Sequence, residues 1–174
     1  MNFEELIRAR QSCREFSDRE VPQEDILACL GAARLSPSAC NAQPYHITVC
    51  TGSVARETAA CLQSAGINKF TSNVPCFFVI SEAPYNIADA GASLLKDQDF
   101  RGIDIGIAVA QLTLCAVDRG LATCILGWFD EKKLQNLLGI KNRIRVVVAL
   151  GCAADGYALR PKVRKELDEL SDIR

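Results

Sequence analysis

The sequence has little of several things that mark particular classes of protein. Its 174 residues include one histidine, one tryptophan and one methionine, and the net charge is only −1. So small a charge gives no long-range field to attract nucleic acid or an anionic membrane. No apolar run reaches membrane-spanning length, and the first residues lack the basic and apolar regions of a signal peptide. We therefore expect one domain over residues 1–174, located in the cytoplasm.

Motifs of nucleotide and metal binding are also missing. Neither GxxxxGK[ST] nor GxGxxG occurs, which argues against P-loop and classical dinucleotide sites. The nine cysteines form no CxxC pair and no Cys/His cluster, so we predict no bound metal. An odd cysteine count without an export signal indicates reduced thiols, which pack as small apolar side chains. A cysteine-based redox or metal protein is the least favoured alternative.

Helix and strand signals alternate along the chain. Helical patterns cover residues 3–10, 22–35, 53–64 and 103–119, and Asp130 is placed to cap a further short helix. Apolar and β-branched runs predict strands over 45–50, 76–80, 122–129 and 145–150. This order predicts an α+β domain with a central mixed sheet flanked by helices. The 103–119 segment is apolar around much of its circumference, which favours burial in a core or at a subunit interface.

Basic residues gather near both ends of the chain. Arg10, Ser12 and Arg14 alternate, so an extended backbone would put them on one side, as binding of a phosphate or another anion requires. The alternative is a solvated basic face paired with nearby acidic residues. Near the other end, a glycine-punctuated turn precedes three cations within residues 160–164, for which the alternative is a solubilising tail.

Two further segments suit contact with a flat ligand. Residues 36–45 place Ser38, Asn41 and Gln43 between two prolines, where their hydroxyl and amide groups could hold the edge of a heteroaromatic ring. A plain structural turn is the alternative. Residues 120–128 surround a predicted strand with small residues, which permits close approach of a flat ligand to the backbone.

Taken in order, these motifs resemble the FMN-binding nitroreductase family. The matches are Arg-x-Ser-x-Arg at 10–14, Pro-Ser-x-x-Asn-x-Gln-Pro-aromatic at 37–45 and Asp-x-Gly at 104–106. Gly-Leu-x-Thr-Cys at 120–124, Gly-x-x-x-x-Gly at 151–156 and Lys-x-Arg at 162–164 complete the set. The resemblance covers nearly the whole chain. It implies a mostly antiparallel sheet, and a homodimer with the long 103–119 helix and the FMN at the interface.

The resemblance also implies roles for particular residues. Arg10, Ser12, Lys162 and Arg164 would hold the FMN phosphate. Arg14 would lie near the N1/O2 edge of the ring and act electrostatically in catalysis. The full set of residues implied to bind the cofactor is Arg10, Gln11, Ser12, Arg14, Pro37, Ser38, Ala39, Asn41, Gln43, Asn68, Lys69, Leu126, Gly127, Lys162 and Arg164.

Within this set, Asn68 would contact the pyrimidine edge of the ring, with Lys69 adding charge. The backbone at Leu126 and Gly127 would face the ring near N5. Residues 37–39 would come from the partner subunit. The only histidine, His46, is interpreted as structural.

The implied activity is a ping-pong reduction, in which NAD(P)H and then a small electron-poor oxidant such as a nitroaromatic or quinone use the same site. An FMN-binding module that senses or stores flavin without turnover is the alternative, because the same residues would hold the cofactor.

The sequence departs from the family in two places. Residues 81–102 form a short connection, which predicts an open substrate channel, and only ten residues follow Arg164, which predicts a short C-terminal arm.

Overall fold

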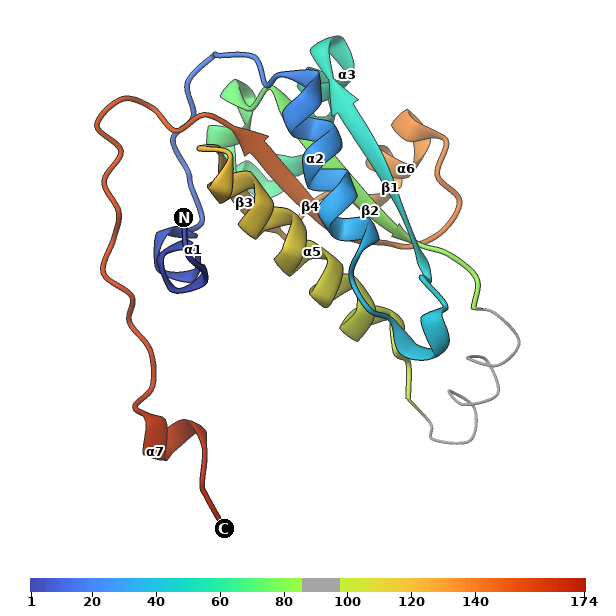
Figure 1. The fold of residues 1–174 in the computed structure, drawn as a ribbon. Coiled ribbons are helices and arrows are strands. Elements are labelled where there is room, and N and C mark those ends of the chain that lie inside the picture. The colour runs from blue at the N-terminus through green and yellow to red at the C-terminus, as the bar shows by residue number, and fades with distance from the viewer. Residues whose placement is uncertain (86–97) are drawn as a thin grey trace.

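The computed structural model describes residues 1–85 and 98–174. Its centre is a four-stranded sheet built from β1 (Tyr45–Thr51), β2 (Cys76–Glu82), β3 (Ala122–Leu126) and β4 (Ile144–Gly151), in the order β1-β2-β4-β3 (Figure 1). Each neighbouring pair of these strands is antiparallel. The α+β class and the mostly antiparallel sheet are confirmed, and the parallel component reduces to an isolated bridge between Ser12 and Thr123.

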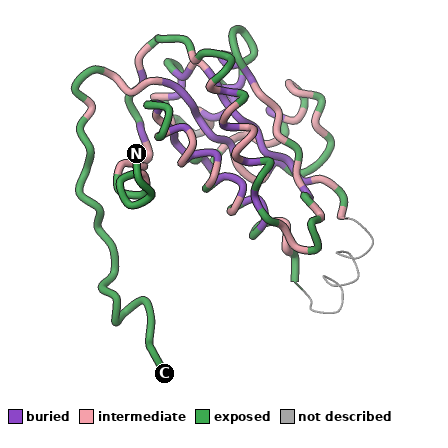
Figure 2. Tube along the Cα trace, viewed as in Figure 1, coloured by how far each residue is buried: buried purple, intermediate pink, exposed green. Residues whose placement is uncertain are grey.

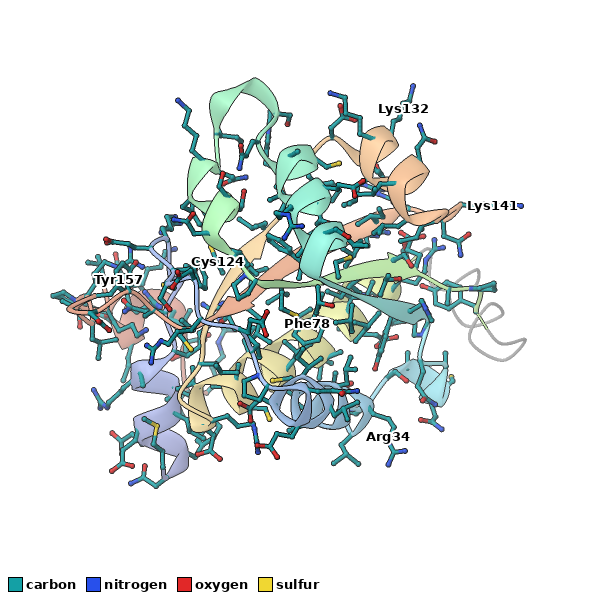
Figure 3. The ribbon with its side chains drawn as sticks, turned by 90° about the horizontal axis from the view of Figure 1, so that it is seen from above. Arg34, Phe78, Cys124, Lys132, Lys141 and Tyr157 are labelled. Atoms are coloured by element: carbon teal, nitrogen blue, oxygen red, sulfur yellow. The ribbon has the colours of Figure 1, made fainter. Side chains whose placement is uncertain are left out.

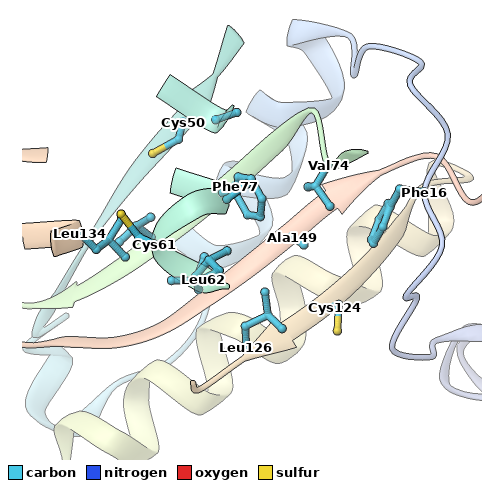
Figure 4. Close-up of a cluster of buried hydrophobic side chains, with 14 of the residues drawn as sticks. Phe16, Cys50, Cys61, Leu62, Val74, Phe77, Cys124, Leu126, Leu134 and Ala149 are labelled. Atoms are coloured by element: carbon cyan, nitrogen blue, oxygen red, sulfur yellow. The ribbon is translucent and has the colours of Figure 1, made fainter. Parts of the chain in front are cut away.

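Helices cover both faces of this sheet. The pair α3 (Gly52–Leu62) and α6 (Glu131–Leu138) lies on one face, and the pair α2 (Gln23–Arg34) and α5 (Arg101–Asp118) lies on the other (Figures 1 and 3). All seven residues of β2 are buried, because this strand is inside the sheet and covered on both sides. Phe77 packs in the α3/α6 core and Phe78 in the α2/α5 core, as the two-residue period of a strand requires. Figure 4 shows part of the first core.

The predicted elements agree with the structure apart from their ends. The strand expected over 122–129 ends at Leu126, because the chain turns away there and Asp130 then caps α6 by accepting a hydrogen bond from the Lys133 amide (3.1 Å). The helix expected over 103–119 is α5, at Arg101–Asp118. Short 3-10 turns, η1 (Ala39–Asn41), η2 (Ser64–Gly66) and η3 (Lys69–Asn73), connect the longer elements.

The segments that follow α1 (Phe3–Ala9) and β4 lie side by side at one end of the sheet. After α1, the extended chain bridges to the sheet at Ser12–Thr123 and to the C-terminal segment at Phe16–Ala153. A side chain at Gly151 would lie 2.9 Å from the Phe16 ring and from Pro75, so this close crossing requires glycine. Beyond it the chain runs out as an exposed arm that ends in the short helix α7 (Leu167–Leu170) (Figure 2).

The predicted open channel over residues 81–102 falls largely on residues 86–97, which lie outside the described residues. Among the helices that the structure describes, none is both long and apolar enough to cross a membrane.

Candidate active site

The N-terminal motif lies along the edge of β3. Arg10 forms the C-cap of α1, and the chain then extends, so that the Cys13 amide donates to the Thr123 carbonyl (2.8 Å) next to the Ser12–Thr123 bridge. The edge position of β3 leaves backbone groups available for this pairing. The predicted alternation of Arg10, Ser12 and Arg14 in an extended segment is therefore what the structure shows.

The C-terminal motif crosses this segment and is hydrogen-bonded to it. The Tyr157 hydroxyl accepts from the Arg14 amide (3.1 Å) and donates to the Ser12 carbonyl (3.4 Å). The Gln11 side chain donates to the Ala158 carbonyl (3.1 Å) and accepts from the Arg160 amide (3.2 Å). Arg160 also donates to the Ser12 carbonyl, and Lys162 donates to the Arg10 carbonyl. Motifs from opposite ends of the chain thus form one cluster.

This cluster, made of Arg10, Arg14, Arg160, Lys162 and Arg164, carries unbalanced positive charge. Burial lowers the pKa of Arg10, and nearby Arg164 lowers it further. The pKa of Lys162 is lowered first by desolvation and then by Arg164, Arg10 and Arg160. Within residues 1–85 and 98–174, no carboxylate lies within 4.0 Å of any of these five cations. The pairing with acidic residues in the predicted alternative is therefore not found in the described residues, although Arg14, Arg160, Lys162 and Arg164 are exposed.

One nitrogen of this cluster points to a missing anion. Arg10 Nη2 is buried and has no hydrogen-bond partner. A buried guanidinium donor left unpaired is costly, so such a group usually has a ligand in the working protein. Arg10 also lines an apolar cleft of about 530 Å³ between α1, α5 and β3, together with Ile7, Gly106, Ala110 and Ile125. The arrangement is a cluster of cations beside an apolar cleft.

A second group of predicted residues lies around the far end of β3. Leu126 is buried and Gly127 is exposed, so the backbone there is open to a ligand. Asn68, in a left-handed conformation (φ 55°), donates from its amide to the carbonyls of Leu62 and Trp128 (both 3.2 Å). Its NH₂ group therefore makes hydrogen bonds to backbone carbonyls of its own chain, a role that the sequence did not indicate. Lys69 beside it is exposed.

The third predicted segment, residues 37–43, lies apart from the other two. Figure 1 shows the loop between α2 and β1 at the opposite end of the molecule from α1 and the C-terminal arm. Its backbone is strained, since Cys40, Asn41 and Gln43 all have positive φ (49°, 53° and 48°). Ser38 Oγ accepts from the Gln43 amide (3.0 Å), and the Gln43 side chain donates to the Asn41 carbonyl (3.1 Å). This loop is preformed but does not reach the cation cluster of its own chain.

The structure adds residues that the sequence reasoning gave no role. Asp104, 2% exposed, accepts a hydrogen bond from the Ala39 amide (3.1 Å) and so anchors the strained loop to α5. Tyr157 and Arg160 join the two cationic motifs. Arg160 was visible as part of the basic run, whereas no local pattern marks Tyr157, because its partners are more than 140 positions away.

Most of the nine cysteines lie in the two cores, and Cys40 is exposed. Six of them, Cys13, Cys29, Cys50, Cys61, Cys76 and Cys124, are buried. Burial raises the pKa of each of these six thiols, for Cys29 and Cys76 to about 12. Thiols held protonated in this way are poor nucleophiles and poor metal ligands. Among the described residues, no group of three His, Cys, Asp or Glu side chains is arranged to hold a metal ion.

An antiparallel sheet flanked by two helix pairs defines the α+β fold class, and comparison with known proteins specifies the family. A family model described as "Nitroreductase family" matches residues 7–152. The chain belongs to the nitroreductase family.

Individual relatives and structures agree with this assignment. The chain is 32% identical over 158 residues to an Archaeoglobus fulgidus protein named "Putative NADH dehydrogenase/NAD(P)H nitroreductase", covering 86% of this chain and 84% of that protein. A nitroreductase family protein from Streptococcus pneumoniae has a similar structure (TM-score 0.82, 20% identity, 99% of this chain and 100% of that one). So does a protein from Exiguobacterium sibiricum solved in complex with FMN (TM-score 0.81, 19% identity, 100% and 98%).

Proposed function

We propose that this protein is an FMN-dependent oxidoreductase that uses NAD(P)H to reduce small electron-poor acceptors, such as nitroaromatics or quinones. The observation that carries the proposal is the cation cluster, in which a buried Arg10 nitrogen has no partner and no described carboxylate balances the charge. FMN fits this site because its phosphate supplies the missing anion and its ring an apolar surface. The FMN complex of the Exiguobacterium protein supports the choice of flavin, and the name of the Archaeoglobus relative supports the electron donor.

Each part of the site has a proposed task. Arg10, Ser12, Lys162 and Arg164 would hold the phosphate, with Gln11 positioning the crossing segment. Arg14, a fixed cation, would stabilise negative charge at the N1/O2 edge of the ring. Asn68 with Lys69 and the Leu126–Gly127 backbone would border the ring. When bound, FMN would supply the redox chemistry, taking electrons from NAD(P)H and giving them to the acceptor in ping-pong order.

We further propose a homodimer with the site at its interface. The preformed loop with Pro37, Ser38, Ala39, Asn41 and Gln43 cannot serve the cluster of its own chain, but a partner's loop could. One side of α5 presents Gly102, Gly106 and Ala110, four residues apart and exposed along the cleft that Arg10 lines, so a partner that approaches this side would cover the cleft. The C-terminal arm exposes Val163, Leu167 and Leu170 (87%, 77% and 71%), which a partner would cover.

The buried protonated thiols suit a reducing compartment, so we place the protein in the cytoplasm.

The activity is tested by anaerobic reduction. We expect protein loaded with FMN to lose its oxidised flavin absorption on addition of NADH or NADPH, and to regain it when a nitroaromatic or a quinone is added. Flavin that stays oxidised with both donors would contradict the enzyme and favour a flavin-storing or flavin-sensing module. Protein that binds no FMN would overturn the proposal as a whole.

The phosphate subsite is tested by removing two of its cations. We expect Arg10→Ala combined with Arg164→Ala to fold but to release FMN, because each charge-assisted hydrogen bond contributes about 1.5–3 kcal/mol to binding. The dissociation constant should rise at least about tenfold for each lost bond. Equilibrium dialysis measures it, and circular dichroism checks the fold. Arg8→Ala is the matched control, since Arg8 is exposed and its one ion pair among the described residues is with Glu4. Unchanged FMN affinity in the double variant would place the phosphate elsewhere.

A further inference from the structure

The only tryptophan in the sequence has an exposed side chain. Trp128 follows β3 directly and is 61% exposed, and nearby Ile67 is 40% exposed. An indole is a large apolar group, and its exposure loses the stabilisation that burial would give. No fold requirement explains it, because the core beneath is filled by Leu126 and Leu134, both buried. A large exposed aromatic side chain is a common feature of binding surfaces.

The backbone that carries this indole is held on both sides. The Asn68 amide donates to the Trp128 carbonyl and also to the Leu62 carbonyl, which ties the segment to the end of α3. Two residues later, the Asp130 amide donates to the Cys61 carbonyl (2.9 Å), and the Asp130 side chain caps α6. The segment 127–130 is therefore fixed to α3 at one side and to α6 at the other. A fixed backbone limits the positions that the indole can reach, so less conformational entropy is lost when a ligand stacks on it.

The place of Trp128 in the chain indicates what its exposed indole could bind. Ile125, three residues before Trp128, lines the apolar cleft, which Trp128 itself does not line in a single chain. The exposed residue Gly127 comes directly before Trp128 in the sequence. The inference rests on the proposed function, which puts the flavin ring beside Leu126 and Gly127. We infer that Trp128 is a specificity-determining residue, whose indole stacks on flat aromatic acceptors and favours them over small inorganic ones. A stacked aromatic pair gains free energy beyond the area it buries, and a small inorganic acceptor gains none of it.

The first test uses the emission of Trp128 itself. Because no other tryptophan is present, its fluorescence reports this position alone. FMN binding is measured separately by dialysis. We expect bound FMN to quench the emission strongly and an added nitroaromatic to compete with iodide for access to the indole. FMN that binds without changing the emission would overturn the role of Trp128 and leave the proposed function standing. Absence of FMN binding would overturn both.

The second test compares acceptors. We expect Trp128→Leu to lower the ratio of kcat/KM for a nitroaromatic to kcat/KM for ferricyanide by roughly two- to tenfold, the size of an aromatic stacking contribution. Trp128→Phe should retain most of the ratio, because it keeps an aromatic face. Phe3→Leu removes another exposed aromatic side chain (69% exposed) and should leave the ratio unchanged. An unchanged ratio in Trp128→Leu, or an equal loss in Trp128→Phe and Trp128→Leu, would overturn the inference.

Discussion

At the scale of single residues, Asp104 shows how one buried carboxylate can organise a loop. One oxygen accepts the hydrogen bond from the Ala39 amide, and the other, Oδ2, is buried without a partner in the described structure. The unpartnered oxygen costs stability, and the strained loop beside it costs more. The unpartnered oxygen and the strained backbone both lie at the segment that we propose to contribute to the site of a partner subunit. We interpret Asp104 as the residue that holds this segment in its binding geometry.

Replacing Asp104 tests this interpretation. We expect Asp104→Ala to release the loop, so that amides of residues 39–42 exchange with solvent faster, since a lost buried hydrogen bond costs about 1–3 kcal/mol. Hydrogen–deuterium exchange with mass spectrometry measures the rates. Asp104→Asn keeps an acceptor oxygen and serves as the matched control, with exchange close to that of the natural protein. If the alanine variant exchanges no faster than the asparagine variant, Asp104 does not anchor the loop.

At the scale of elements, a charge network joins β2, β4 and the start of α5. Glu82 of β2 pairs with Arg101 (2.8 Å) and with Arg145 of β4, and Asp99 pairs with both arginines (2.9 and 2.8 Å). The Arg101 guanidinium also lies over the Tyr85 ring, 5.0 Å from its centroid. Hydrogen bonds from Arg101 are the main reason that the pKa of Asp99 lies below its usual range. The network fixes the end of the cleft that Arg145 lines, opposite Arg10.

The lowered pKa of Asp99 predicts a pH dependence of stability. An aspartate whose folded pKa lies below its unfolded value, about 3.9, stabilises the fold above that pH and loses this effect as pH falls toward the folded value. We expect Asp99→Asn to lower the free energy of unfolding at neutral pH by only about 0.5–1 kcal/mol, since 40% of the side chain is exposed and solvent screens its ion pairs.

Urea unfolding at several pH values measures this effect. The difference between Asp99→Asn and the natural protein should shrink as the pH drops below about 4, because the carboxyl of the unfolded chain then binds a proton that the folded carboxyl, with its lowered pKa, does not yet bind. Asp172→Asn, in the exposed arm, is the control and should shift stability little at any of these pH values. A difference that stays constant with pH would mean that Asp99 acts through packing and not through its charge.

At the scale of the whole molecule, the proposed dimer depends on the open side of α5. A Cβ atom added at Gly106 would meet nothing within 4 Å in a single chain, so we expect the protomer to tolerate Gly106→Leu, which also favours the helix by about 1 kcal/mol. We expect this variant to be monomeric by light scattering while circular dichroism shows that it is folded. Gly31→Leu on α2, also with open space, is the matched control and should stay dimeric. A Gly106→Leu dimer would exclude this face as the interface.

The sequence by itself determined the elements and the family motifs. The strand at β2 and the helix α5 were predictable because an apolar run rich in aromatic and β-branched residues and a helical pattern of apolar residues are both local properties of the sequence. The spacing of Arg10, Ser12 and Arg14 also predicted an anion site, since extended backbone alternates its side chains. Small errors remained at element ends, as at Leu126, where the turn toward Asp130 ends the strand.

Only the tertiary structure decided which motifs share a site. The order β1-β2-β4-β3 puts β3 at the edge, which leaves it open to residues 10–14 and brings residues 157–164 across them. No local pattern could show this, because the contacts join positions about 150 apart. The same holds for the use of the Asn68 amide on the Trp128 carbonyl, and for the separation of the 37–43 loop from the cluster. Long-range packing of the sheet, not residue type, settles each of these outcomes.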